Sequence, residues 1–588
     1  MTLPRSFQDW VHWLELGSGA RLIRRTAFAV GLAILSFWIC YKQFHGPRTE
    51  TTLRQAVVGR QLTDGHGFTT LVNDPQTAAF VAARNGRWNT QPFPELHQAP
   101  LYPALIGAVF QLVPESIRNY FFQTAPTPPD GFIPDYILLG LNVVLFWIAA
   151  AQTYFLSRAL FDRRVGVVSA VALLLSAPYW DSVVAVNGTA LATVIVLGLI
   201  QAVIRVEAAS SRGILPLAGL LITGLFCGGL FLTDYAAGLS VLVLLGYVWV
   251  RFPGERFRAI LVLVLGFLVV ISPWCTFLLA HTGNPVGFAW QEIAMKVDGT
   301  AADPAVVRAT LSVAGPGLDL AKLGNKALTA IQSAITQNMW AGGGLWFTGL
   351  FVAGLFYRFR EERVNALRAL IVALFVVLIL GNALFDSGEG ERLPTTYAAP
   401  LLVIFGAGFA AVLISSSEKL DTHALWAFSA LLALQALPLA KALLEPRKLH
   451  FQYPPYYPTL FISMREEMWA RSGGTTRGWM ADVPAGAAWY SGQRVWTMPA
   501  ELRDFYAIGA EQPMVALVLT PKTLDKPFLS ELAHHSPNES DRVGDWSQIF
   551  KSLVTGKPVP GFPLALRQNL ADNFCVLIDP QAVPNRRR

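Results

Sequence analysis

Long apolar runs separated by polar connections fill most of the chain between residues 27 and 444. An α-helix of about 20 apolar residues spans a bilayer, and most of the runs approach that length. Several are shorter, and we expect about eleven crossings in all. The predicted spans are 27–44, 136–160, 165–180, 188–206, 214–232, 236–251, 258–281, 342–358, 368–386, 395–415 and 422–444.

Clusters of arginine fall on alternate connections between these runs, a pattern typical of cytoplasmic loops. The segment 1–26 is polar, aromatic-rich and ends in arginines, so we expect an amphipathic N-terminus in the cytoplasm, followed by an uncleaved first span. This orientation places two large loops, 45–135 and 282–341, and the tail 445–588 outside. The arginines are Arg21, Arg24, Arg25, Arg163, Arg164, Arg205, Arg212, Arg251, Arg256, Arg258, Arg358, Arg360, Arg363 and Arg368.

The segment LYPALIGAVFQLV, residues 101–113, is apolar but too short for a comfortable span. Counting it as a crossing would place every later arginine cluster on the opposite side of the membrane. We therefore expect a helix that lies at the outer membrane face and belongs to the first outer loop.

The tail 445–588 is long enough for a small domain and has the mixed pattern of a soluble fold. The stretch MVALVLT predicts a buried strand, and ELRDFYAIG is a helix candidate. Residues 479–496 predict a strand, a turn, a short helix and a second strand. Asp482 is then a turn residue or, alternatively, part of a binding loop. We predict an extracytoplasmic α/β domain.

Composition agrees with a membrane protein, since 53% of the residues are hydrophobic and only 14% are charged. The net charge of +7 comes largely from clusters beside the apolar runs, so we expect no nucleic-acid partner. The four cysteines have neither a disulfide framework nor a zinc spacing. They are most simply small packing residues.

Two acids and a histidine approach the outer membrane face from the first loop. Glu50 follows the first span, and Glu95 and His97 precede the short apolar segment. The structural alternative for Glu50 is plain: Thr49 caps a helix whose first turn contains Glu50, and the acid pairs with Arg54 at i+4. A lone loop histidine likewise has a structural alternative to the orienting of phosphate or the relay of a proton.

Several motifs, in order, resemble the GT-C class of polytopic membrane glycosyltransferases, which use polyprenyl-phosphate-linked sugars, particularly bacterial relatives of aminoarabinose and dolichyl-phosphate-mannose transferases. An acid follows the first span, the next helix ends in GRQLTDGHGF, and HQAPLYP opens the short helix. The resemblance continues through FLTDY, SPWCTFLLAHTGNPVGF and GERLPTTYAAPLL. It covers roughly residues 25–415, and each motif alone would be weak evidence.

The resemblance implies a transferase in which an acceptor hydroxyl attacks a sugar held on a lipid phosphate. Such chemistry needs a carboxylate or other base for the acceptor and positive charge for the departing phosphate. Glu50 is then the catalytic candidate, and Arg392 suits the phosphate because a guanidinium binds phosphate oxygens bidentately. The alternative for Arg392 is an interfacial ion pair with Glu389 or Glu391. The other candidates for donor phosphate or substrate binding are His97, Glu95, Tyr397 and Asp234.

The chain also departs from the family pattern. Glu50 stands where the family usually has aspartate, and AVNGTALA has Asn187 and Gly188 where many members carry an acid. Asp181 or Asp234 are the possible substitutes, and Asp234 is equally a helix cap. We therefore expect no obligatory metal and no assured cofactor, with a divalent cation left open.

The sequence favours transfer of a sugar from a polyprenyl-phosphate donor to a lipid, glycan or protein acceptor at the outer face of a bacterial inner membrane. The alternative is a non-catalytic relative that binds a lipid-linked glycan or a partner protein. Transport is a weaker option, because the polar candidates gather at span ends rather than at mid-membrane. If the chain is an enzyme, Glu50, His97 and Arg392 should converge within about 10 to 12 Å.

Overall fold

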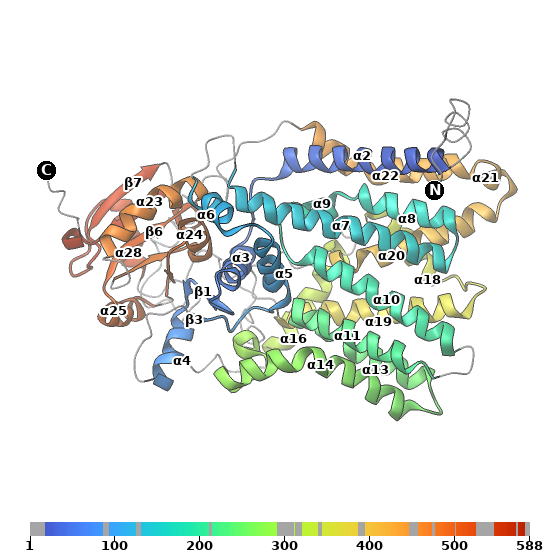
Figure 1. Ribbon diagram of the computed structural model, residues 1–588, viewed down its shortest axis with the longest axis horizontal. Coiled ribbons are helices and arrows are strands. Elements are labelled where there is room, and N and C mark those ends of the chain that lie inside the picture. Colours follow the sequence, from blue (N-terminus) through green and yellow to red (C-terminus); the bar gives the residue numbers. More distant parts are fainter. Residues whose placement is uncertain are drawn as a thin grey trace.

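The computed structural model describes most of the chain, and Figure 1 shows its arrangement. The residues described are 18–85, 93–124, 131–210, 215–290, 311, 320–338, 344–385, 394–445, 457–472, 477–499, 501–524, 546–571 and 574–582. Arg392, Glu389 and Glu391 lie outside these residues, so the predictions made for them are not examined by the structure.

Within the described residues seven helices are long and apolar enough to cross a membrane. A bent pair, α8 (Arg163–Leu174) and α9 (Ala177–Val184), makes an eighth candidate, with an angle of 53° at a break just before Pro178. The seven are Arg25–Gln43 of α2 (Ser18–Gln43), α7 (Ile133–Leu160), α10 (Thr189–Ser210), α14 (Arg256–Thr282), α19 (Glu362–Phe385), Thr396–Ser415 of α20 (Pro394–Ser415) and α22 (Ala424–Leu444).

The three remaining predicted spans are helical but short. They form α11 (Leu217–Thr233), the pair α12 (Tyr235–Gly238) and α13 (Ser240–Arg251), and α18 (Leu345–Leu355). The helical, multi-pass membrane architecture is therefore confirmed, while a count of eleven crossings stays a prediction for these short helices.

Small residues let some of these helices approach closely. A Cβ at Gly224 of α11 would lie 2.1 Å from the Leu263 carbonyl oxygen of α14, and one at Gly266 would lie 2.4 Å from the Leu221 oxygen. The hydrophobic effect does not drive helices together within lipid, because the lipid tails are as apolar as the side chains. Close packing of the backbones at small residues therefore contributes to the association of membrane helices.

Three of the arginine-bearing connections lie together. Arg251 at the end of α13 pairs with the buried Glu207 of α10 at 2.8 Å, and an Arg363 Nη2 donates to the Ile204 carbonyl at 3.4 Å. The ends of α10 and α13 and the start of α19 therefore meet, as the alternation of arginines predicts. The orientation of this face toward the cytoplasm stays a prediction.

The first outer loop contains helices and three very short strands. These are α3 (Glu50–Thr63), β1 (Thr69–Thr70), β2 (Val72–Asn73), α4 (Pro75–Asn85), β3 (Phe93–Pro94), α5 (Leu101–Gln111) and α6 (Glu115–Gln123). The apolar segment 101–113 is thus largely helical, as expected, and it packs along α3. The second outer loop contains η1 (Gly287–Trp290), α16 (Leu320–Ser333) and η2 (Ala334–Asn338).

The tail forms a mixed α/β unit, which confirms the predicted pattern of elements. Its helices are α23 (Tyr457–Ser472), α24 (Pro484–Ser491), α25 (Leu502–Glu511), α26 (Pro521–Leu524) and α28 (Ser547–Thr555), and its strands are β4 (Gly478–Ala481), β5 (Val495–Thr497), β6 (Met514–Leu519), β7 (Leu566–Ala571) and β8 (Phe574–Ile578). Every residue of β6 is buried. Asp482 ends β4, where its Oδ2 accepts the Thr520 amide at 2.9 Å and the Thr523 hydroxyl at 2.8 Å.

The six-stranded sheet includes a strand from outside the tail. Its order is β2-β5-β4-β6-β8-β7, in which β2, β5, β4 and β6 are parallel and β8 is antiparallel to both of its neighbours, β6 and β7. The first strand, β2, belongs to the first outer loop. In Figure 1 the long helices run side by side, and the α/β unit lies beyond one end of them together with α3, α4 and α5. The division of the chain at residue 445 stays a prediction.

Candidate active site

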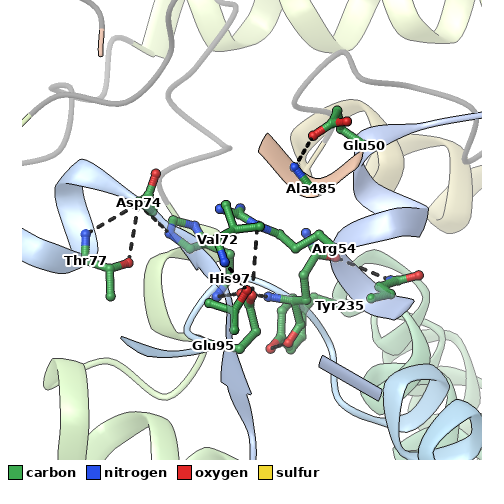
Figure 2. Close-up of polar contacts among 12 residues, drawn as sticks. Glu50, Arg54, Val72, Asp74, Thr77, Glu95, His97, Tyr235 and Ala485 are labelled. Carbon is green, nitrogen blue, oxygen red and sulfur yellow. Dashed lines mark hydrogen bonds and ion pairs between the residues drawn. The ribbon is translucent and has the colours of Figure 1, made fainter. Parts of the chain in front are cut away.

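Glu50 lies in the first turn of α3, and its carboxylate contacts the tail. Thr49 caps α3, as the sequence indicates, because its hydroxyl accepts the Thr52 amide at 3.2 Å. The Glu50 Oε2 accepts the Ala485 amide at 2.7 Å, and Oε1 accepts the Gly486 amide at 3.2 Å. These amides belong to the first turn of α24. In Figure 2 the Glu50 carboxylate meets Ala485, apart from the group of charges around His97.

That group, which we call the loop cluster, consists of Arg54, Asp74, Glu95 and His97 (Figure 2). Arg54 comes from α3, Asp74 follows β2, and the other two follow β3. The Glu95 Oε1 accepts the amides of His97 at 2.9 Å and Gln98 at 3.1 Å, while Oε2 lies 4.0 Å from the Arg54 Nε. Glu95 is only 2% exposed, so a carboxylate buried there needs these donors.

Asp74 and His97 form a carboxylate–imidazole pair. The His97 Nε2 lies 3.3 Å from the Asp74 Oδ2, and the imidazole packs against the Phe288 ring. An ionised carboxylate can only accept, so Nε2 carries the proton and Nδ1 of the neutral ring is an acceptor. Among the described residues Nδ1 has no hydrogen-bond partner, and the side chain is 18% exposed. The pair therefore offers one oriented basic nitrogen.

The Asp74 carboxyl is ionised over the whole physiological range. Burial by itself raises the pKa of the Asp74 carboxyl, but the hydrogen bond from His97, together with the positive charges of Arg54 and of the imidazolium that His97 forms at low pH, has the larger effect and lowers it. The Thr77 amide, whose nitrogen lies 3.4 Å from Oδ2, acts in the same direction. The resulting pKa of Asp74 is about 2. The carboxylate can thus orient His97 without taking its proton.

Three of the family-like motifs meet beside the loop cluster. The Tyr235 hydroxyl of FLTDY donates to the Gln98 carbonyl of HQAPLYP at 3.2 Å, and it accepts the indole N–H of Trp274 from SPWCTF at 2.9 Å. Asp234 caps α12 by accepting the Ala236 amide at 3.0 Å, which agrees with its capping alternative. Residues far apart in the sequence therefore build one region beside the loop cluster.

Two other candidates lie elsewhere or cannot be placed. Tyr397 of α20 is 3% exposed and packs within the main hydrophobic core. Arg392 lies outside the described residues. The expected convergence of Glu50, His97 and Arg392 therefore stays a prediction, as do the roles given to these residues.

The turn before α10 stands where many family members carry an acid. Asn187 caps α10, since its Oδ1 accepts the Thr189 amide at 3.1 Å. Val186 has a φ of 59°, an unfavourable conformation for a β-branched residue, and its carbonyl accepts the Tyr102 hydroxyl at 2.7 Å. Within the described part of the chain no three His, Cys, Asp or Glu side chains gather as metal ligands.

Sequence reasoning missed Asp74 and considered Arg54 only as a partner of Glu50. The stretch LVNDP contains the one available signal, an acid before the proline that opens α4, and it predicts a helix cap. Asp74 does cap the start of α4, because its Oδ2 accepts hydrogen bonds from the amide and the hydroxyl of Thr77. Its second partner, His97, lies in the segment after β3, 23 residues away, and no local sequence pattern predicts such a contact.

Comparison with known proteins found similar structures only. No protein-family model and no curated protein matches the chain. ArnT from Cupriavidus metallidurans bound to undecaprenyl phosphate is 12% identical, with a TM-score of 0.51 over 95% of this chain and 99% of that one. The oligosaccharyltransferase of Archaeoglobus fulgidus in complex with zinc and sulfate is 12% identical, with a TM-score of 0.52 over 89% and 70%.

A further structure, of the A. fulgidus oligosaccharyltransferase AglB with an inhibitory peptide and a dolichol-phosphate, is 12% identical over 85% of this chain and 70% of that one, with a TM-score of 0.50. At this level of identity the likeness concerns the fold. The resemblance inferred from the motifs is confirmed at that level: the chain has the GT-C fold of polytopic membrane glycosyltransferases.

Proposed function

We propose that this protein transfers a sugar from a polyprenyl-phosphate-linked donor to an acceptor hydroxyl at the outer face of a bacterial inner membrane. The fold supports the proposal, because similar structures hold undecaprenyl phosphate or a dolichol-phosphate. The acceptor is a lipid, glycan or protein.

The Asp74–His97 pair is the observation that carries the proposal. An acceptor hydroxyl becomes a better nucleophile as a positioned base takes its proton, an effect of about 10² to 10⁴ in rate. His97 Nδ1 is oriented by the carboxylate on Nε2 and has no other partner among the described residues. In the proposed step Nδ1 takes the hydroxyl proton as the oxygen bonds to the anomeric carbon, while the lipid phosphate leaves with the bonding electrons.

The remaining residues have supporting roles in this proposal. Glu95 fixes the backbone of His97, and Arg392 is assigned to the departing phosphate, because a guanidinium stays charged beside it. Tyr397 and Asp234 stay proposed substrate contacts on the strength of the motifs alone. Glu50 already accepts two backbone amides, so it suits an orienting role better than that of the base.

A turnover assay tests the proposal. The purified full-length protein is given a panel of labelled polyprenyl-phosphate sugars and simple acceptors, and consumption of donor is followed for the parent and for His97→Gln. The control is His423→Gln, since His423 is exposed at the end of α21 (Glu418–Thr422), on the predicted cytoplasmic side.

We expect the parent and the control to consume at least one donor at equal rates, and His97→Gln to lower kcat by about 100-fold or more. A parent that binds polyprenyl phosphate but consumes no donor in the panel would support the non-catalytic alternative. Equal kcat in His97→Gln and the parent would remove His97 from the chemistry.

A further inference from the structure

We infer that the C-terminal α/β unit completes the candidate active site, with Trp496 as a positioning residue that holds both halves of the Asp74–His97 pair. The inference rests on the proposed function for its kinetic consequence. Its structural consequence, the dependence of Asp74 on the tail, can be measured separately.

Asp74 directly follows a strand whose place is set by the tail. The strand β2 has two residues and pairs in parallel with β5, with Val72 opposite Val495 and Asn73 opposite Trp496. The Val495 amide donates to the Leu71 carbonyl at 3.0 Å. A strand this short has little stability of its own, so β5 fixes where the chain leaves the sheet and presents Asp74.

Trp496 also contacts the segment that holds His97. Its ring meets the Phe93 ring edge-on, with centroids 6.2 Å apart, and Phe93 begins β3, shortly before Glu95 and His97. Trp496 is 2% exposed, and its indole N–H donates to the Gln512 Oε1 at 2.8 Å. One rigidly held indole of the tail thus touches both strands from which the two partners extend.

Helix α24 holds the same unit against α3. Glu50 accepts the first amides of α24, whereas the Arg60 Nη1, near the other end of α3, donates to the Trp489 carbonyl at the end of α24 at 3.4 Å. The two helices therefore run parallel, and each has an acid at its positive end and a base at its negative end. This arrangement lowers the free energy of the docked state through the helix dipoles.

A buried carboxylate from the membrane part adds a third attachment. Asp135, in the first turn of α7, accepts the Trp489 indole N–H at 2.8 Å and the Tyr490 hydroxyl at 3.0 Å. Asp135 is 2% exposed, so removal of either donor would leave a buried acceptor less well satisfied. The α/β unit is thus fixed to α3 and α7 and carries β2 at one edge of its sheet.

The test perturbs the contacts between the tail and the first loop without changing a residue of the loop cluster. Trp496→Leu removes the indole, and Arg60→Met removes the donor at the end of α24, with Arg60→Lys as its conservative rescue. Trp426→Leu is the matched control, because Trp426 is 74% exposed on α22. Hydrogen exchange of residues 71–77 is measured in each variant, together with kcat and KM for the donor.

We expect exchange at residues 71–77 to be at least tenfold faster in Trp496→Leu and Arg60→Met, with kcat lower and donor KM unchanged. Arg60→Lys and Trp426→Leu should match the parent. Unchanged exchange at 71–77 in folded variants would overturn the inference, and so would faster exchange with an unchanged kcat.

The two proposals fail in different ways. If the parent transfers no sugar, the proposed function fails, while the exchange of residues 71–77 still decides whether the tail positions Asp74. If Trp496→Leu does not fold, Arg60→Met decides the result, since Arg60 lies at the edge of the interface and its side chain is 20% exposed.

Discussion

The Asp74 carboxylate forms a hydrogen bond with His97, which lies 23 residues further along the chain. The carboxylate orients an imidazole, and the imidazole in turn stabilises the buried charge of Asp74. Without His97 the pKa of Asp74 would be higher, and without Asp74 the His97 ring would lose the hydrogen bond that orients it. This mutual dependence has a measurable effect on stability at low pH.

The folded-state pKa of Asp74 is about 2, below the ordinary value of 3.8, so ionised Asp74 stabilises the fold above about pH 4. This contribution, about 2 kcal/mol at most, is lost as the pH falls from 4 toward 2. We predict that the thermal midpoint of the parent falls more steeply over this range than that of Asp74→Asn. Parallel melting curves for the two proteins would contradict the low pKa.

For single residues, the sequence predicts interactions with near neighbours in the chain and misses contacts between residues that are far apart in it. Thr49 is found as a helix cap, and Glu95 and His97 are correctly grouped, because short motifs contain them. The acceptor role of Glu50 depends on Ala485, 435 residues away, and no periodicity encodes such a contact.

At the scale of the elements, α3 packs against both α5 and α24. Gly59 makes the approach to α5 possible. A Cβ there would lie 2.5 Å from the Ile106 Cγ2 and 3.0 Å from the Pro103 carbonyl oxygen. Gly107 of α5 faces the Gly59 carbonyl at a similarly short distance, so neither helix can give way easily.

We predict that Gly59→Ala lowers the free energy of unfolding by about 1 to 3 kcal/mol, because it overpacks this contact. The control is Gly509→Ala in α25, where nothing lies within 4 Å of the added Cβ. There the loss of glycine's backbone freedom should stabilise the protein slightly. Equal thermal midpoints for Gly59→Ala and the parent would show that α3 and α5 can move apart freely.

The helices are the elements that the sequence predicts well, because long apolar runs and caps are local signals. Three strands of the tail, β4, β5 and the fully buried β6, were predicted from such local signals, whereas β7 and β8 were not predicted. The strand β2 was missed. Its two residues carry no recognisable alternation, and it exists only through pairing with β5.

On the scale of the whole molecule, the chain combines a bundle of membrane helices with an α/β unit assembled from two distant segments. The core of that unit contains Ala78 and Phe93 of the first loop beside residues of the tail. The predicted boundary at residue 445 separates the membrane part from the tail by sequence, yet the sheet crosses it. The arginine clusters predict which connections share one side of the membrane, and three of those connections, at the ends of α10 and α13 and the start of α19, do lie together.

The measurement that tests the central claim most directly is a double-mutant cycle on donor consumption by the purified full-length protein. The parent, Asp74→Asn, His97→Gln and the double variant are each supplied with the polyprenyl-phosphate sugar that the parent uses. Because the two residues act as one unit, the double variant should be about as slow as His97→Gln alone, about 100-fold below the parent. Independent effects that multiply in the double variant, or full turnover in either single variant, would contradict the account.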